Sequence, residues 1–168
     1  MQKAYIKLDG IDYLTVLSKE YLLPTAYLAP IEYYSILLQS PNSLIEKHEY
    51  FIKQTIRNRC EIYGSNGKLL LTIPKKRSSK SNNIIKDTQI SYTNNWQKKH
   101  WKSIESAYNS SPFFPFYRDE IYTIFMQKEK FLLDFNLKLQ NNILEILNIE
   151  YKNNLTISYI KETDKVDL

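Results

Sequence analysis

Residues 44–74 read LIEKHEYFIKQTIRNRCEIYGSNGKLLLTIP, and they contain the clearest structural pattern in the chain. Between residues 55 and 63 the side chains alternate, and only Asn58 interrupts the apolar row. Such alternation is typical of a half-buried strand. An amide in an apolar row needs hydrogen-bond partners, because an unsatisfied buried amide costs about 1–3 kcal/mol. We therefore expect Asn58 to be buried and hydrogen-bonded, and Arg57 to point away from it.

The sequence after this strand predicts a β-hairpin. Residues 65–67 (SNG) have the composition of a tight turn, and residues 68–74 (KLLLTIP) predict a returning apolar strand. Outward from the hairpin, apolar periodicity and the positions of Pro and Asn predict the other elements. Strands are expected at residues 21–23, 44–48, 84–92 and 155–160, and helices at residues 30–39, 96–109, 116–127 and 131–148.

This order of elements predicts an α+β fold. Strands dominate up to about residue 92 and helices follow, so the helices should cover one side of a small mixed sheet. The expected inward-facing residues are Ile31, Tyr34 and Leu38 in the first helix, Trp96, Trp101, Ile104 and Tyr108 in the second, and Leu132, Phe135, Leu139, Ile143, Ile146 and Leu147 in the last. Residues 1–20 are expected to be an N-terminal extension with a weak hairpin pattern around Asp9-Gly10, and residues 21–168 to form a single domain.

Composition limits the classes of protein to which the chain can belong. The 168 residues include 23 Lys and Arg against 18 Asp and Glu, a mild positive excess that suits an anionic ligand. The single cysteine excludes an internal disulfide and fits a reducing compartment. The sequence has no apolar run long enough to span a membrane and no signal-peptide pattern, so we expect a cytoplasmic protein. The composition leaves the oligomeric state open.

Several common catalytic motifs are absent from the sequence. Glycine occurs only at positions 10, 64 and 67, so neither a P-loop nor a G-x-G-x-x-G loop can form. No G-x-S-x-G sequence occurs. Two histidines and one cysteine are scattered along the chain, and no carboxylate cluster has ligand spacing, which disfavours a zinc site. We therefore expect neither a cofactor nor a metal.

Three segments of the chain resemble the WbqC-like family. They are LPTAYLAP at residues 23–30 followed by Tyr33-Tyr34, a run from Phe51 and Lys53 through Asn58-Arg59 and a Gly-containing turn to Pro74, and the set Trp96, His100, Tyr108, Pro112, Phe113 and Phe114. The match covers roughly residues 21–149 in the family's order. The family takes its name from bacterial O-antigen gene clusters, so the resemblance implies a role in surface-polysaccharide biosynthesis without naming a reaction. Many members continue beyond the position where this chain stops, which leaves the completeness of the domain open.

The polar residues that match the family pattern form the candidate site. Arginine suits phosphate or carboxylate groups, lysine adds a point charge, and histidine titrates near neutral pH. The expected catalytic residues are His100 and Lys53, and the expected substrate-binding residues are Thr25, Tyr27, Gln54, Asn58, Arg59 and His48. A functional site would require these residues, which come from separated segments, to meet in one pocket. The alternative is a structural role, with Asn58 bonded to nearby backbone and the arginines in solvent.

Cys60 and His100 offer a second kind of chemistry, since a nearby imidazole can lower the pKa of a thiol. Cys60, however, shares its row with Ile56 and Ile62, and free cysteine is a common core residue. The resemblance points the same way, because many family members carry Asn at the matching position. We therefore favour a core role for Cys60.

Two functions of different classes remain. The favoured one is an enzyme of surface-polysaccharide precursor biosynthesis that acts on a nucleotide-linked sugar or an acyl donor, with acyl or aminoacyl transfer as the candidate reaction. The alternative is a non-catalytic module that binds nucleic acid through the basic hairpin and the loop at residues 75–80 (KKRSSK). The enzyme is favoured because the resemblance points to polysaccharide genes and because the cations lie in a patterned strand.

Overall fold

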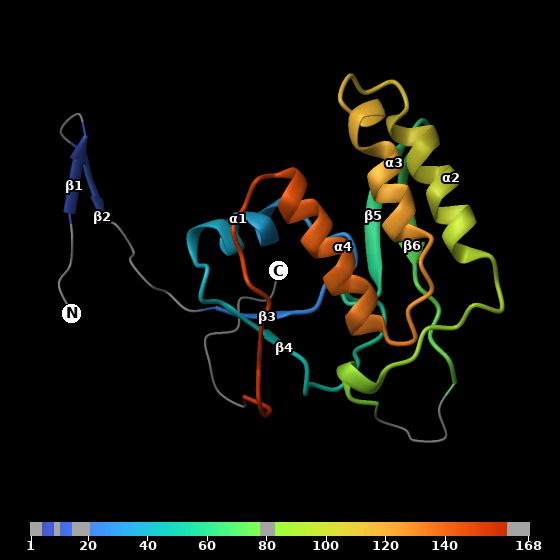
Figure 1. The fold of residues 1–168 in the computed structure, drawn as a ribbon, viewed down its shortest axis with the longest axis horizontal. Coiled ribbons are helices and arrows are strands. Elements are labelled where there is room, and N and C mark those ends of the chain that lie inside the picture. Colours follow the sequence, from blue (N-terminus) through green and yellow to red (C-terminus); the bar gives the residue numbers. More distant parts are fainter. Residues whose placement is uncertain (1–4, 9–10, 15–20, 78–82, 161–168) are drawn as a thin grey trace.

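The computed structural model describes residues 5–8, 11–14, 21–77 and 83–160 of the chain, and Figure 1 shows their arrangement. In chain order the elements are β1 (Tyr5–Leu8), β2 (Ile11–Leu14), β3 (Leu22–Pro24), α1 (Ile31–Gln39), β4 (Leu44–Glu46), β5 (Arg59–Gly64), β6 (Gly67–Thr72), the short 3₁₀ helix η1 (Ile85–Asp87), α2 (Trp96–Tyr108), α3 (Phe114–Phe125), α4 (Leu132–Ile146) and β7 (Asn154–Leu155). Parallel and antiparallel strands gather in the N-terminal half, and the helices lie mostly in the C-terminal half. The predicted α+β class is therefore confirmed.

Strands β3, β4 and β7 form a parallel sheet with β4 in the middle. Leu23 pairs with Ile45, which in turn pairs with Leu155 on the other side. Helix α1 joins β3 to β4, because two parallel strands need a crossover connection. Strand β4 ends before the predicted residue 48, because the Glu46 carboxylate accepts a hydrogen bond from the His48 backbone N–H at 2.7 Å and turns the chain.

Glu46 also ties the last described residues to the sheet. Its side chain is buried, and its Oε1 accepts a hydrogen bond from the Thr156 hydroxyl at 2.7 Å, while its Oε2 accepts one from the Ile160 N–H at 3.1 Å. These hydrogen bonds offset the free energy that the carboxylate loses when burial removes its hydration. The predicted strand at residues 155–160 is therefore wrong beyond Leu155, because the following backbone turns toward Glu46.

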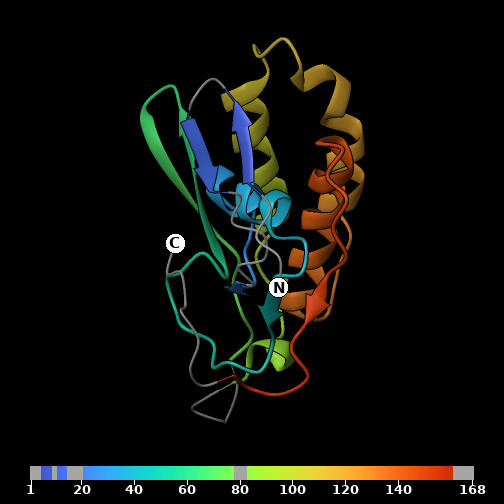
Figure 2. The ribbon, with the colours of Figure 1, turned by 90° about the vertical axis from the view of Figure 1, so that its left-hand side faces the viewer.

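Strands β5 and β6 form the predicted antiparallel hairpin. Arg59 pairs with Thr72 at its open end, and Gly64 pairs with Gly67 at the turn. Gly67 has a φ of 102°, which glycine adopts without steric cost. Figures 1 and 2 show helices α2, α3 and α4 gathered on one side of this hairpin.

The predicted start of the first hairpin strand at residue 55 is wrong. The Thr55 hydroxyl donates to the Ile52 carbonyl at 3.0 Å, and the Asn58 N–H donates to the Thr55 carbonyl at 3.2 Å. Such local bonds compete with a strand ladder. Gln54 adopts a left-handed φ of 61°, which also breaks extended backbone. Residues 53–58 therefore form turns and a bend, and the strand begins at Arg59.

Asn58 is buried and hydrogen-bonded, as predicted. Its Nδ2 donates to the Ile73 carbonyl at 3.0 Å, and the Ile73 N–H donates to the Asn58 carbonyl at 2.8 Å. The amide thus extends the hairpin pairing beyond Arg59 and Thr72. The guanidinium of the neighbouring Arg57 binds Glu49.

An aromatic cluster forms the centre of the core. The ring centroids of Trp96 and Phe135 lie 5.5 Å apart, and those of Trp101 and Phe125 lie 5.8 Å apart. Tyr27 joins the cluster with centroid distances of 6.4 Å to Phe125 and 6.3 Å to Phe135. Aromatic pairs of this kind contribute about 0.5–1.5 kcal/mol each beyond their buried area. The cluster fixes the turn after β3 against the helices.

Helix α4 buries most of the predicted stripe. Leu132, Phe135 and Leu139 are each 1% exposed, as the 3.6-residue period predicts. Leu147 is 45% exposed, so its predicted burial is wrong, because the helix ends at Ile146.

Helix α1 presents a different face from the predicted one. Ile31 and Leu38 are 72% and 61% exposed, whereas Tyr33 and Leu37 are fully buried. The Tyr33 hydroxyl donates to the Pro24 carbonyl at 2.9 Å. This bond turns the Tyr33 face toward the sheet. Of the predicted inward-facing residues Tyr34 is buried, whereas the predictions for Ile31 and Leu38 are wrong.

The predicted strand at residues 84–92 is wrong. Its backbone N–H and C=O groups form hydrogen bonds with several different segments and not with one neighbouring strand. The N–H groups of Ile85 and Ile90 donate to the carbonyls of Glu49 and Lys130, and the Thr88 carbonyl accepts from Leu132. The segment contains η1 and isolated bridges in place of a strand.

Helix α3 begins at Phe114, two residues before the predicted start. Its first turn contains Pro115, and proline is favourable in a first helical turn.

The region predicted to be an N-terminal extension contains the antiparallel pair β1–β2, in which Tyr5 pairs with Leu14. The hairpin turn predicted around Asp9-Gly10 falls outside the described residues, as do residues 78–80 of the predicted basic loop. Within the described ranges, no helix has the length and apolar character needed to cross a membrane.

Candidate functional site

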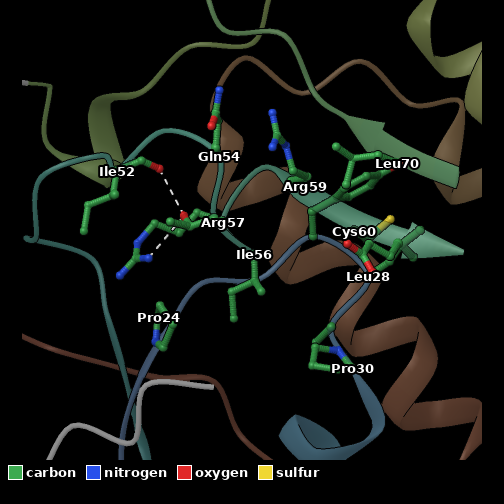
Figure 3. A pocket seen from close by; sticks show the side chains of 14 residues that line it. Pro24, Leu28, Pro30, Ile52, Gln54, Ile56, Arg57, Arg59, Cys60 and Leu70 are labelled. Atoms are coloured by element: carbon green, nitrogen blue, oxygen red, sulfur yellow. Dashed lines mark hydrogen bonds between the residues drawn. The ribbon is translucent and has the colours of Figure 1, made fainter. Parts of the chain in front are cut away.

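A pocket of about 690 Å³ lies between the turn that joins β3 to α1 and the segment that leads into β5 (Figure 3). Its lining residues are Pro24, Tyr27, Leu28, Ala29, Pro30, Ile52, Gln54, Thr55, Ile56, Arg57, Arg59, Cys60, Glu61 and Leu70. The Tyr27 N–H donates to the Ile56 carbonyl at 2.8 Å and so joins the two walls. The pocket is mostly apolar, and its charged groups come from the second wall.

Each wall carries one residue in a strained backbone conformation. Leu28 has a φ of 44° and Gln54 a φ of 61°, a region that residues with a Cβ rarely adopt. Such conformations cost about 1–3 kcal/mol each and are concentrated at ligand sites, where the surrounding structure holds them. The Tyr27–Ile56 bond lies next to Leu28 and supplies part of that support.

Arg57 is neutralised by an ion pair behind the pocket. Its Nε and Nη2 donate to the two carboxylate oxygens of Glu49 at 2.8 and 2.5 Å, and its Nη1 donates to the Thr55 hydroxyl at 3.3 Å. The side chains of Arg57 and Glu49 are only 12% and 8% exposed. All three guanidinium nitrogens are therefore occupied, and the two-point geometry fixes the loop between Glu49 and Arg57.

Arg59 presents a charge to the pocket without a counter-charge. Its Nε donates to the Thr72 hydroxyl at 3.2 Å, and within the described part of the chain no carboxylate lies within ion-pair distance of its guanidinium. The Gln54 side chain projects in the same direction as that of Arg59 (Figure 3). The third charged lining residue, Glu61, binds Lys68 at 3.1 Å in an exposed position. Arg59 and Gln54 can therefore offer hydrogen-bond donors to an anion.

Asn136 of helix α4 holds both walls from behind. Its Nδ2 donates to the Thr25 hydroxyl at 3.1 Å and to the Arg57 carbonyl at 2.8 Å. The side chain is buried, so these bonds are shielded from competing water. Asn136 thus couples the helical half of the protein to the shape of the pocket.

His100 lies in the core behind Tyr27. The Tyr27 hydroxyl and His100 Nδ1 are hydrogen-bonded at 2.9 Å, and the imidazole and Trp96 rings pack in a T-shaped arrangement. Burial lowers the pKa of His100 to about 4, so the ring is neutral at physiological pH. Burial, followed by the nearby Cys60, raises the pKa of Tyr27 well above its usual value. The pair is therefore uncharged, and His100 holds the orientation of Tyr27.

Cys60 lines the pocket as a protonated thiol. Burial raises its pKa to about 12, which is opposite to the shift that a thiolate nucleophile needs. The side chain packs against the core cluster that contains Ile62 and Leu71. This environment fits the core role expected for Cys60.

The WbqC-like protein family matches residues 25–168, which is most of the chain. The chain belongs to this family. It is also 26% identical over 118 residues to the uncharacterized protein Rv1507c of Mycobacterium tuberculosis (strain ATCC 25618 / H37Rv). That match covers 70% of the chain and 51% of the relative, so the chain spans about half the length of this relative. No solved structure matches the chain.

The pocket of this WbqC-like protein contains part of the predicted site. Tyr27, Gln54 and Arg59 line it, and their roles in binding stay predictions. Five predicted residues do not line it, namely Thr25, His48, Lys53, Asn58 and His100. Thr25, Asn58 and His100 are buried behind the walls, and Lys53 is exposed to solvent. His48 lines a separate cavity of about 400 Å³, together with Tyr50 and Ile84.

Sequence reasoning missed the supports of the pocket. Glu49 and Asn136 had no assigned role, although polar residues at inward positions of a helix, such as Asn136 and Gln140, are a usable signal for a buried hydrogen-bond network. The sequence contains no comparable signal for the Glu49–Arg57 pair. Arg57 falls in the polar row of the alternating pattern, where a strand residue is expected to face solvent. Among the described residues, no group of three or more His, Cys, Asp or Glu side chains is arranged to hold a metal ion.

Proposed function

We propose that this WbqC-like protein binds an anionic small-molecule substrate in the pocket beside Arg59 and acts as an enzyme of surface-polysaccharide precursor biosynthesis. The proposal is carried by the Arg59 guanidinium, which lines a pocket of about 690 Å³ and, within the described ranges, lacks a carboxylate partner. A guanidinium in this position suits a phosphate or carboxylate group of a ligand.

The volume of the pocket, its lining and the strained backbone of two lining residues support the same proposal. Its volume falls within the usual range of small-molecule sites, about 300–1,000 Å³, and an apolar lining with a few polar groups is typical of such sites. Left-handed backbone at Leu28 and Gln54 supports a ligand role, since a purely structural turn would gain stability from glycine there.

The proposed reaction is acyl or aminoacyl transfer in which a nucleotide-linked sugar or an acyl donor is bound. Arg59 holds the anionic group, Gln54 bonds an amide or hydroxyl of the substrate, and Tyr27, oriented by His100, forms the wall. Because Cys60 is protonated at neutral pH, the attacking amine or hydroxyl belongs to the acceptor substrate. It forms a bond to the acyl carbon, the bond from that carbon to the donor's leaving group breaks, and the proton of the acceptor passes to that leaving group. The protein then accelerates transfer by holding donor and acceptor in a reactive geometry.

A ligand screen with matched variants tests this proposal. Thermal unfolding would be followed with nucleotide sugars, acyl donors and single-stranded oligonucleotides, because a ligand that binds the folded state raises the unfolding temperature. We expect at least one anionic small molecule to stabilise the wild-type protein and Arg59→Ala to abolish that shift. Lys152→Ala is the matched control, since Lys152 is exposed and does not line this pocket.

Two results would contradict the proposal. One is an Arg59→Ala variant that binds the selected ligand as tightly as the wild type. The other is stabilisation by oligonucleotides alone that depends on Lys53 and Lys75 and not on Arg59. That pattern would favour the nucleic-acid-binding module.

A further inference from the structure

A second cleft, of about 460 Å³, lies between the turn of the β5–β6 hairpin and helix α2. The hairpin contributes residues 64–69 to its lining, and α2 contributes Lys99, Lys102, Ser103, Ser106 and Ala107. Together with Lys68 the lining contains three lysines and no acidic residue, so we call it the lysine cleft.

The exposure of Leu69 shows why this space is open. Leu69 pairs with Ile62 and shares a face of β6 with Leu71, because alternate residues of a strand face the same side. Ile62 and Leu71 are 7% and 3% exposed, whereas Leu69 is 41% exposed. The core-facing row of the hairpin is therefore uncovered near its turn, where the lysine cleft lies.

Two of the three lysines have no carboxylate partner. Lys68 binds Glu61 at 3.1 Å. Across the described ranges of the chain, no carboxylate lies within ion-pair distance of Lys99 or Lys102. Two ammonium groups on the α2 wall thus remain available to an anion.

The same lysines are unfavourable for α2 itself. Lys98 and Lys99 fall within the first four residues of the helix, where no acidic residue occurs and the helix dipole disfavours cations. Lys102 follows three residues after Lys99 and four after Lys98, spacings at which like charges repel each other on a helix surface. Glu105, at the next turn, pairs with Arg118 instead. A binding role accounts for charges that destabilise the helix without a compensating contact.

From these observations we propose that the lysine cleft binds a phosphomonoester or diphosphate group, with Lys99 and Lys102 as its cations. Such a group carries close to two or more negative charges at neutral pH, which matches two unpaired ammonium groups, whereas a carboxylate would leave one of them without a counter-charge. The side chains of Ser65, Asn66 and Ser106 form no hydrogen bond within the described part of the protein, so they can donate to phosphate oxygens.

This site is separate from the proposed anion site at Arg59. Arg59 pairs with Thr72 at the open end of the hairpin, whereas Gly64 pairs with Gly67 at the turn. A strand rises about 3.4 Å per residue, so the two ends lie roughly 17 Å apart along β5. One phosphate group cannot contact both ends, and the inference does not depend on the proposed function.

Glycine amide signals offer a direct test, because the chain has glycine only at positions 10, 64 and 67. In an NMR spectrum of protein with isotope-labelled glycine, the signals of Gly64 and Gly67 report on the lysine cleft, which both residues line. The protein would be titrated with inorganic pyrophosphate and, at the same ionic strength, with acetate. We expect pyrophosphate to shift both signals saturably and to bind at least about fivefold more tightly than acetate, which can satisfy only one of the two lysines.

Charge-removing variants identify the cations. Lys99→Gln/Lys102→Gln should weaken pyrophosphate binding about tenfold, and each single substitution about threefold, which decides the matter if the double variant does not fold. Lys98→Gln is the matched control, since Lys98 is exposed on the same helix but does not line the cleft, and it should change binding by less than about twofold. Arg59→Ala should leave this titration unchanged.

Vesicles distinguish the two sources of such a group, a soluble ligand and a lipid headgroup. The wild-type protein would be sedimented with phosphatidylcholine vesicles with and without phosphatidic acid, whose headgroup is a phosphomonoester. Retention that requires phosphatidic acid and is lost in Lys99→Gln/Lys102→Gln supports a lipid headgroup as the occupant. Pyrophosphate binding without retention on vesicles supports a soluble phosphorylated ligand.

Three results would overturn the inference. The first is pyrophosphate that leaves the signals of Gly64 and Gly67 unshifted or binds no more tightly than acetate. The second is equal binding by the wild type and the folded lysine variants. The third is a single-stranded oligonucleotide without terminal phosphates that binds through the same lysines more tightly than pyrophosphate, which would identify a nucleic-acid surface in place of a phosphomonoester site.

Discussion

Helix α4 and the loop at residues 52–58 meet at Asn136, yet they are stabilised in different ways. The helix is held by its own period, which places Leu132, Phe135 and Leu139 on one buried face. The loop has no such internal order, and its shape depends on bonds to distant residues, from Arg57 to Glu49 and Asn136 and from Ile56 to Tyr27. The difference teaches that the scaffold of this protein is encoded locally, whereas the pocket is encoded by a few long-range hydrogen bonds.

The strongest test of the scaffold is Leu139→Ala. Leu139 is 1% exposed, so the cavity left by truncation should lower the free energy of unfolding by about 2–5 kcal/mol. Chemical denaturation would measure the loss. Leu147→Ala on the exposed end of the same helical segment is the control and should cost far less, and a loss below about 0.5 kcal/mol for Leu139→Ala would contradict the packing of α4.

Asn136→Ala tests the junction between the two regions. The substitution removes the bonds to Thr25 and to the Arg57 carbonyl and leaves buried acceptors unpaired, so it should cost about 1–3 kcal/mol. It should also weaken ligand binding, whereas Leu139→Ala should not do so in the remaining folded protein. Asn141→Ala is the control, because Asn141 is exposed on the same helix. Equal effects of the two asparagine variants on stability would refute the proposed coupling.

A pH titration tests the helical core separately from the pocket. The folded-state pKa of His100 is lowered by burial to about 4 from an ordinary value of 6.5. Between these two values the unfolded state binds the proton more tightly, so stability is fully present above pH 6.5 and decreases as the pH falls toward 4. Denaturation curves at several pH values would show this slope, and His100→Gln should flatten it. A slope that survives in the variant would assign the effect to other groups.

The smallest expected change comes from relieving strain in the loop. Gln54→Gly should raise the free energy of unfolding by about 0.5–1 kcal/mol, because glycine adopts a φ of 61° without the cost that glutamine incurs. The same variant should weaken ligand binding, since it removes an amide from the pocket. Lys53→Gly is the neighbouring control at a residue without positive φ, and it should lower stability. A destabilised Gln54→Gly protein would show that the left-handed conformation is not strained.

The sequence predicted the elements whose cause is local. The turn residues that end at Gly67 predicted the hairpin. The alternation of apolar residues around Asn58 predicted that this side chain is buried. The sequence could not predict that Ile31 would be exposed, because a Tyr33 bond to Pro24 sets the rotation of α1. Alternation alone likewise could not show where the strand before Arg59 begins.

The candidate site was predicted only in part, for the same reason. Tyr27, Gln54 and Arg59 line the pocket, but the pattern that pointed to them also pointed to Lys53, which is exposed. The role of Glu49 depends on a contact with Arg57 across a loop, and a single sequence contains no periodicity that reports such a contact. Polar residues at a site can thus be named from sequence, whereas the partner that cancels one of their charges requires coordinates.

The buried Glu46 carboxylate has a consequence for the order of folding. Its hydrogen-bond donors Thr156 and Ile160, and the β7 strand that pairs with β4, lie more than 100 residues further along the chain. During synthesis β4 can pair with β3 early, but its other edge and the Glu46 side chain stay without these partners until residue 160 has left the ribosome. Closing so long a loop is entropically slow, so completion of the parallel sheet should be a late event, after the hairpin and the helices have formed.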